Sequence, residues 1–114
     1  MNPVQFYKCL ADDTRLRTLL LIVHEGELCV CELTAAMDLS QPKISRHLAL
    51  LRGADLLQDR RQGQWVFYRI NPALEGWAKS ILQETLQANR HFIEADLRNL
   101  IQMGDRPLRA TLCC

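Results

Sequence analysis

Residues 27–51 have the sequence ELCVCELTAAMDLSQPKISRHLALL, which predicts two short helices joined by a tight turn. The first helix is expected over Cys29–Met37, and the next two residues form the turn. Ser40 is a good N-cap for the second helix, and Pro42 fits in its first turn because no backbone donor is needed there. This order of elements is that of a helix-turn-helix unit.

The second of these helices has one apolar and one polar face. At roughly 100° per residue, Ile44 and Leu48 lie on one side, whereas Lys43 and Arg46 lie on the other. For an isolated helix, a solvated basic face is the plain interpretation. The polar face also suits the DNA major groove, where Arg pairs with guanine and Gln with adenine. The residues expected to contact DNA from this helix are Gln41, Lys43, Ser45, Arg46 and His47.

His47 has two interpretations. It lies at the flank of the packed face of the helix, so a structural hydrogen bond suits it as well as a DNA contact does.

Downstream of this unit the hydrophobic period changes from helical to alternating. Residues 57–61 and 64–70 predict two strands, and Gln62-Gly63 predicts the turn between them. Arg60 and Arg61 are expected at the tip of the hairpin, where they would contact phosphates and position the protein without specifying a sequence. A helix-turn-helix followed by a hairpin predicts a mainly α fold, the winged helix-turn-helix, with the hairpin as its wing.

Helices are also expected on both sides of this region. Pro3 opens a short first helix, and Asp12 or Asp13 caps a second helix that Gly26 ends. The first helix carries on one face Val4, Tyr7, Leu10 and Ala11.

A long final helix completes the predicted fold. Asn71-Pro72 is expected to open this helix, and Gly104 and Pro107 stop it. Its apolar stripe, which includes Leu74, Trp77 and Ile81, is larger than a lone helix of a small monomer needs. Dimerisation is the simplest explanation.

Size and composition indicate one domain. We expect residues 1–104 to form the DNA-binding and dimerisation domain and residues 105–114 to form a C-terminal tail. No apolar run approaches the roughly 18 residues of a membrane span, and Met1 is not followed by a basic and then apolar leader. The expected location is therefore the cytoplasm, with no membrane partner.

The positive charge is concentrated in one region. Residues 40–70 contain six basic and two acidic residues, a net charge of +4, whereas the whole chain carries only +1. The remainder therefore carries −3. The basic part coincides with the predicted helix-turn-helix and wing, where a polyanion would bind.

The five cysteines predict a thiophilic site rather than a disulfide framework. They are odd in number and occur in a helical sequence, and two of them form the Cys29-Val30-Cys31 motif. Thiolates select soft ions, and arsenic or antimony in the trivalent state binds two or three of them. A CxC motif by itself is weak evidence, because two small residues can simply pack at a helix start.

The geometry of an ideal helix complicates this site. Residues two apart point roughly 200° away from each other, so gripping one ion with Cys29 and Cys31 is expected to unwind the helix start locally. The helix N-terminus is expected to lower the pKa of these thiols and favour ligation. Unwinding would then disturb the support of the DNA-reading helix and act as a switch.

Three segments resemble the ArsR/SmtB family of winged-helix repressors, and most of all its arsenic-responsive branch. They are residues 27–33, residues 39–48 and residues 62–68. The resemblance covers the chain from about Phe6 to the end of the final helix. It implies a homodimer joined by the first and last helices, which represses an operon by binding double-stranded operator DNA. It also implies release from DNA when arsenite or antimonite binds, with no other cofactor required and no enzymatic activity.

The sequence departs from the family pattern in one respect. Many arsenic sensors of this kind carry a third cysteine three residues after the CxC pair, and here that residue is Thr34. A third ligand could come from Cys9, from Cys113 or Cys114, from water or a small thiol, or be absent.

Other members of the same class remain as alternatives. A cadmium- or lead-responsive repressor would use the same CxC pair, and a thiol-based redox repressor would oxidise it. The paired ligands of the zinc branch are incomplete here, since only His91 and Glu94 match the second half of that set. A thiol-disulfide enzyme is not favoured, because this sequence has no CxxC motif after a strand.

Overall fold

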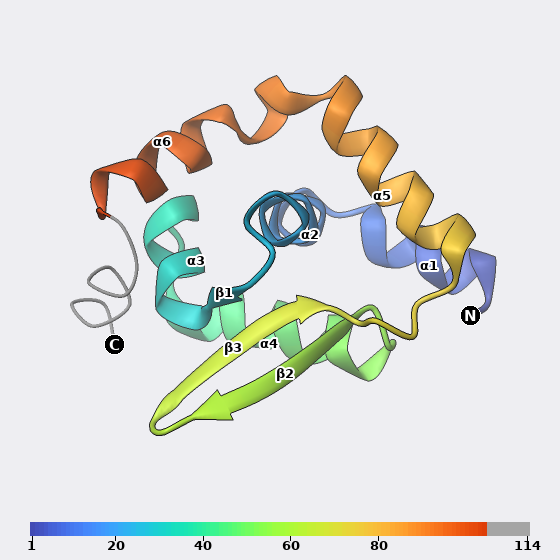
Figure 1. Ribbon diagram of the computed structural model, residues 1–114, viewed down its shortest axis with the longest axis horizontal. Helices are drawn as coiled ribbons and strands as arrows, with labels where there is room; N and C mark the ends of the chain where they lie inside the picture. The colour runs from blue at the N-terminus through green and yellow to red at the C-terminus, as the bar shows by residue number, and fades with distance from the viewer. Residues whose placement is uncertain (105–114) are drawn as a thin grey trace.

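The computed structural model describes residues 1–104, and the tail expected at residues 105–114, with its two cysteines and Pro107, lies outside the described residues. Within that range the sheet is formed by β1 (Leu28–Cys29), β2 (Leu57–Gln62) and β3 (Trp65–Ile70). Helices α2 and α5 run on one side of the hairpin, and α4 runs behind it (Figure 1). The helices are α1 (Pro3–Leu10), α2 (Asp13–Glu25), α3 (Val30–Met37), α4 (Gln41–Gly53), α5 (Gly76–Ala88), the 3-10 helix η1 (Arg90–Ile93) and α6 (Glu94–Gln102).

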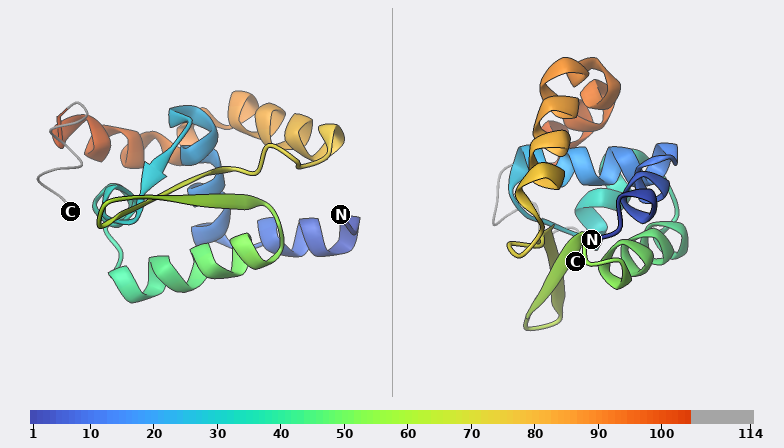
Figure 2. Two further views of the ribbon diagram at one scale, coloured as in Figure 1. Left: turned by 60° about the horizontal axis from the view of Figure 1, so that its bottom comes forward. Right: turned by 90° about the vertical axis from the view of Figure 1, so that its right-hand side faces the viewer.

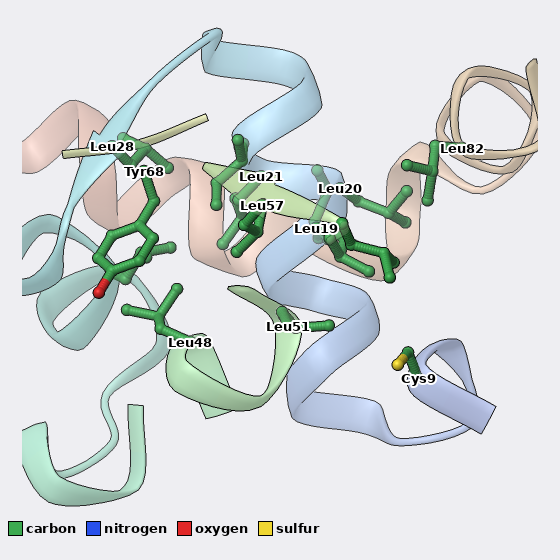
Figure 3. Close-up of a cluster of buried hydrophobic side chains, with 14 of the residues drawn as sticks. Cys9, Leu19, Leu20, Leu21, Leu28, Leu48, Leu51, Leu57, Tyr68 and Leu82 are labelled. Carbon is green, nitrogen blue, oxygen red and sulfur yellow. The ribbon is translucent and has the colours of Figure 1, made fainter. Parts of the chain in front are cut away.

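The core is built around α2. Four consecutive residues of this helix, from Leu19 to Ile22, are completely buried, so α2 is enclosed on all sides. Leu48 and Leu51 of α4 and Leu57 of β2 lie beside it in the same cluster of buried side chains (Figure 3). The predicted apolar face of α4 is therefore confirmed. Because this face packs on the core, the opposite, polar face of α4 points to solvent.

The boundaries of the helix-turn-helix follow from local capping. The Ser40 hydroxyl accepts a hydrogen bond from the Lys43 backbone N–H at 3.4 Å, which starts α4 as predicted. Asp12 caps α2 by accepting from the Arg15 N–H at 3.0 Å, and Gly26 ends α2 with a φ of 90°. The mainly α winged helix-turn-helix fold is confirmed.

The sheet contains a strand that the sequence did not predict. The strand order is β1-β3-β2, all neighbours are antiparallel, and Cys29 of β1 lies opposite Phe67 of β3. Cys29 therefore belongs to a strand, and α3 begins only at Val30, one residue later than expected. A two-residue strand gives little periodicity and is set by its partner β3, which explains why the pattern missed it.

The hairpin turn is shifted by one residue from the prediction. Gln62 pairs with Trp65, so the turn consists of Gly63 and Gln64, and Gly63 adopts a φ of 63°. Arg60 lies opposite Phe67, within the strand rather than at the tip. The prediction placed Arg60 at the tip because it located the turn one residue too early.

The prediction of a single long final helix was wrong. Asn71 accepts a hydrogen bond from the Ala73 N–H at 3.0 Å and forms a turn, so α5 begins at Gly76. A second break at Asn89, with φ −134° and ψ 39°, separates α5 from η1 and α6. One straight helix over residues 72–104 would be about 50 Å long, which exceeds the 38 Å long axis of the molecule. The breaks let α5 cover α2 and α6 cover α3.

Two polar contacts hold α6 in this position. Nε and Nη2 of Arg17 in α2 donate to the two carboxylate oxygens of Asp96 at 2.9 and 2.6 Å. The side-chain amide of Asn99 donates to the Ala36 carbonyl of α3 at 2.8 Å. The end of α6 is therefore beside the helix that carries Cys31 (Figure 1).

The face of α1 that packs on the core also differs from the prediction. Phe6 and Cys9 are buried, whereas Val4 is 62 % and Tyr7 is 52 % exposed. Phe6 packs edge-on against the Trp77 ring of α5, with the ring centroids 5.1 Å apart. Because the Phe6 ring is buried, the predicted apolar face of α1 with Val4 and Tyr7 points outward. Within the described chain, α1 therefore carries an apolar surface that no other element covers.

Candidate functional site

The two cysteines of the CxC motif converge. Their Sγ atoms lie 3.4 Å apart, which is far longer than a disulfide bond of about 2.05 Å. Cys29 is the N-cap of α3 with an extended backbone, at φ −89° and ψ 167°, and only Cys31 lies inside the helix. The 200° separation of an ideal helix therefore does not apply to this pair. The geometric reason for expecting that an ion unwinds the start of α3 is therefore absent in this structure.

Glu32 stabilises this arrangement by hydrogen bonds with Cys29. Its Oε1 accepts a hydrogen bond from the Cys29 backbone N–H at 2.9 Å, and the Cys29 side chain accepts from the Glu32 N–H in return. This is a reciprocal capping box in which a thiol takes the place of the usual hydroxyl. Glu32 is completely buried. Glu32 was not predicted as a site residue, although its position three residues after the N-cap is the capping-box signal.

The helix N-terminus does not produce the expected thiol acidity. Burial raises the pKa of the Cys29 thiol above its ordinary value, and the nearby Glu32 carboxylate raises it further. The backbone N–H groups of Glu32 and Cys31 act in the opposite direction but have the smaller effect. The predicted lowering of the pKa is therefore wrong for Cys29, because desolvation exceeds the N-terminal hydrogen bonds.

A cavity of about 770 Å³ opens beside the cysteine pair. It lies between the start of α3, the first residue of α4 and the turn end of the hairpin. Its wall is largely apolar, and it contains no charged side chain among the described residues. The lining residues are Cys29, Val30, Cys31, Thr34, Ala35, Gln41, Gln64, Trp65 and Val66.

The predicted DNA-contacting residues of α4 lie mostly on its free side. Gln41 and Arg46 are exposed, and Lys43 and Ser45 are partly exposed. His47 is different, because only 9 % of it is exposed. Burial lowers the pKa of His47 despite the opposing effect of the Asp12 carboxylate. Of the two roles considered for His47, this position favours the structural one.

The wing projects from the body of the molecule beside α4, as Figure 2 shows. Arg61 is exposed on its β2 strand, opposite Val66. The guanidinium of Arg60 donates to both carboxylate oxygens of Glu27, at 2.7 and 2.6 Å, and lies 4.7 Å from the centroid of the Phe67 ring. Glu27 was not predicted as a partner of the wing, because no local signal connects it with a residue 33 positions away.

No helix within residues 1–104 is both long and apolar enough to cross a membrane. In the same part of the chain, no group of three or more His, Cys, Asp or Glu side chains could hold a metal ion. Among the residues that the structure describes, the cysteine pair is therefore not part of a larger cluster of such side chains.

Solved structures share this fold. HlyU from Vibrio cholerae matches with a TM-score of 0.70 and 31% identity, over 77% of this chain and 91% of that one. The AntR antimony-specific transcriptional repressor matches with a TM-score of 0.65 and 32% identity, over 77% of both chains. The fold, the basic helix and the wing define a winged-helix transcriptional regulator.

The sequence comparisons narrow this class. The profile of the family described as bacterial regulatory protein, arsR family, matches residues 12–59. The arsenic resistance transcriptional regulator ArsR2 of Pseudomonas putida is 53% identical over 100% of this chain and 99% of its own length. The arsenical resistance operon repressor of Escherichia coli is 53% identical over 90% of this chain and 87% of its own. The chain belongs to the ArsR family and is a regulator rather than an enzyme.

Proposed function

We propose that the protein is a homodimeric repressor that binds operator DNA and leaves it when Cys29 and Cys31 bind trivalent arsenic or antimony. The observation that carries this proposal is the 3.4 Å separation of the two Sγ atoms at the edge of a cavity. Two converging sulfur donors suit a soft, thiophilic ion, and the nearby Glu32 carboxylate is engaged by the Cys29 backbone N–H. The names of the arsenic resistance relatives from Pseudomonas putida and Escherichia coli agree with this chemistry.

The position of the cavity supports a link between inducer and DNA. It is lined by Gln41, the first residue of α4, and by Gln64 and Trp65 of the wing. An ion bound at the cysteine pair therefore lies between the two elements that would contact the duplex. If the ion binds the DNA-free form more tightly, DNA affinity falls by the same factor, and such couplings are typically about 1–3 kcal/mol.

The DNA interface of this repressor comprises the free face of α4 and the wing. Arg46 and Gln41 contact base edges in the major groove, and Lys43 and Ser45 lie beside them. Arg61 contacts phosphate from the wing. In a twofold dimer, two such helices would reach half-sites about 34–36 Å apart.

The dimer forms through α1 and the adjoining start of α5. Val4 and Tyr7 expose apolar surface on α1, and Trp77 of α5 is in ring contact with α1 through Phe6. These helices lie side by side at the N-terminal end of the molecule (Figure 1). Large exposed apolar side chains on adjoining helices are typical of an interface.

The alternatives have less support. A tetrahedral metal site of the cadmium or zinc kind uses four ligands, and only two converge within residues 1–104. A redox sensor reacts through an acidic and accessible thiol, and Cys29 does not have these properties, because it is buried with a raised pKa.

Fluorescence anisotropy of a labelled promoter fragment tests the proposal. Arsenite, antimonite, cadmium, zinc and peroxide are titrated separately against the complex of reduced protein and DNA, and the first two are expected to release the DNA. Cys29→Ser and Cys31→Ser should bind DNA but resist release, whereas Cys9→Ala, altered outside the cavity, should respond normally. Release by cadmium alone or by peroxide alone would replace the proposal with the corresponding alternative.

A further inference from the structure

We infer that Arg60, held by Glu27, is a positioning residue that transmits inducer binding from Cys29 to the DNA contact of the wing. This inference rests on the proposed function and extends it, because it assigns the path between the cysteine pair and the duplex. It gives Arg60 a role other than the phosphate contact expected from the sequence.

Cys29, Phe67 and Arg60 form one row across the three-stranded sheet. Cys29 of β1 lies opposite Phe67 of β3, and Phe67 in turn lies opposite Arg60 of β2. Directly opposed residues of antiparallel strands project on the same face, with Cβ atoms about 4.5–5.5 Å apart. The side chain of an inducer ligand and the side chain of a wing arginine are therefore separated by a single aromatic ring.

Arg60 is held by two groups, and both are tied to Cys29. Its guanidinium lies 4.7 Å from the centroid of the Phe67 ring and donates to both carboxylate oxygens of Glu27. Phe67 is tied to Cys29 by strand pairing, whereas Glu27 precedes Cys29 by two residues in the chain. A displacement of Cys29 as it binds arsenic therefore moves both anchors of Arg60 together.

Both anchors depend on orientation. A bidentate pair requires the planes of the guanidinium and the carboxylate to align, and a cation–π contact requires the cation to lie over the ring face within about 6 Å. Phe67 is only 5% exposed, so its ring moves with the strand that carries it. A small shift of Cys29 is therefore sufficient to release Arg60, and α3 need not unwind.

Arg60 in turn positions the DNA contact of the wing. Arg61 is the next residue of β2, is exposed and projects on the opposite face of the strand. Nη1 of Arg60 also donates to the Gln62 side-chain oxygen at 2.9 Å, so its contacts extend to the last residue of β2. Fixing Arg60 therefore fixes the direction in which Arg61 projects, and releasing Arg60 weakens the phosphate contact of Arg61.

A second ion pair of the wing provides a matched control. Nη1 of Arg52 in α4 donates to the Asp59 carboxylate of β2 at 3.2 Å. Asp59 lies opposite Tyr68, one position along from Phe67, so it projects on the other face of the sheet. Glu27→Gln and Asp59→Asn each remove one negative charge and one arginine contact. They differ in whether the lost contact belongs to the row that contains Cys29.

The test measures the coupling factor, which is the ratio of the DNA dissociation constants with and without saturating arsenite. Anisotropy of the labelled promoter fragment with reduced, full-length protein gives both constants. Glu27→Gln and Arg60→Gln should each lower the factor at least about threefold, as substitutions within a coupling network do. The double variant should match the single variants, because the pair acts as a unit. Asp59→Asn should keep the wild-type factor.

The arsenite affinity of the DNA-free protein separates transmission from a role at the cysteines. Trp65 lines the cavity beside Cys29 and Cys31, so tryptophan fluorescence is expected to report arsenite binding. Glu27→Gln and Arg60→Gln should bind arsenite as the wild type does, because the cysteine pair is intact. A weaker arsenite affinity of the DNA-free variants would overturn the inference, since these residues would then act on the inducer site itself.

Each remaining contrary result has its own meaning. A wild-type coupling factor in Glu27→Gln and Arg60→Gln would overturn the inference and leave the cysteine pair as the inducer site. An equal loss of coupling in Asp59→Asn would also overturn it, because the effect would then come from the charge of the wing in general. Failure of arsenite to weaken DNA binding by the wild type would instead reject the proposed function.

Discussion

Glu27 and Arg60 form a bidentate ion pair that joins the residue before β1 to the wing, with N···O distances of 2.7 and 2.6 Å. Arg60 also lies over the ring of Phe67, the residue opposite Cys29 across the sheet. The guanidinium of Arg60 is thus engaged by two groups of the protein itself, the Glu27 carboxylate and the Phe67 ring. Arg61, the next residue, is exposed and lies opposite Val66 in the hairpin.

The two wing arginines should therefore contribute differently to DNA binding. Arg61→Gln is expected to lower the slope of log K against log salt by about 0.9, the value for one lost phosphate contact. Arg60→Gln should change this slope less, because its charge is already paired with Glu27. Anisotropy titrations at several salt concentrations measure both slopes. A larger change for Arg60 would show that the ion pair opens on DNA.

His47 should make folding stability depend on pH. Its pKa is lowered by burial, so the folded protein binds the proton less readily than the unfolded chain. The free energy of unfolding is therefore highest above about pH 6.5, the ordinary histidine pKa, and decreases as the pH falls towards the lowered pKa.

Urea unfolding between pH 8 and about pH 5 measures this effect while carboxylates stay ionised. The charged groups that act on His47 are Asp12 and Arg15 from α2, with Lys43 and Arg46 from α4. His47→Gln should remove most of the slope in this window. An unchanged slope in His47→Gln would contradict this assignment.

The contact between Arg17 and Asp96 should be important for stability. Arg17→Ala leaves a buried carboxylate without its partner, and breaking such pairs costs about 3–5 kcal/mol; because the Arg17 side chain is 22% exposed, we expect about 2–3 kcal/mol. Arg98→Ala removes an exposed pair with Glu94 on the same helix and should change stability by less than about 0.5 kcal/mol. Urea unfolding compares the two, and equal losses would contradict the burial argument.

The dimer surface can be tested with exposed residues, whose substitution does not disturb the core. Val4→Glu or Tyr7→Glu should shift sedimentation equilibrium towards the monomer, because a charge would be buried at the interface. Ile101→Glu, at the 76 % exposed site on α6, should leave the dimer intact. Dissociation by Ile101→Glu alone would place the interface on α6 instead.

Much of the fold was predictable from local sequence. The caps at Asp12 and Ser40, the apolar spacing of Ile44 and Leu48, and the change of period before the hairpin all act between near neighbours. The errors occurred where distant packing overrides local preference. Asn71-Pro72 has the signature of a helix start, but the chain must turn there before α5 can cross α2.

The candidate site shows the same division. The CxC motif and the basic helix identified the residues, because residue type and spacing specify the chemistry that a segment can perform. The approach of the two sulfurs was misjudged, because pairing of Cys29 with β3 takes it out of the helix. The pairing of Arg60 with Glu27 was not visible, since nothing local connects them.

The amino-acid pattern alone determined the order of the first four helices and the hairpin, the basic surface of α4 and the presence of soft ligands. Those properties depend on hydrogen bonds and hydrophobic spacing within a few residues. Tertiary structure decided that Cys29 and Cys31 face each other, that α6 covers α3 and that Cys9 is separated from them by the core. These facts depend on contacts between segments far apart in the chain, which packing selects and local periodicity does not encode.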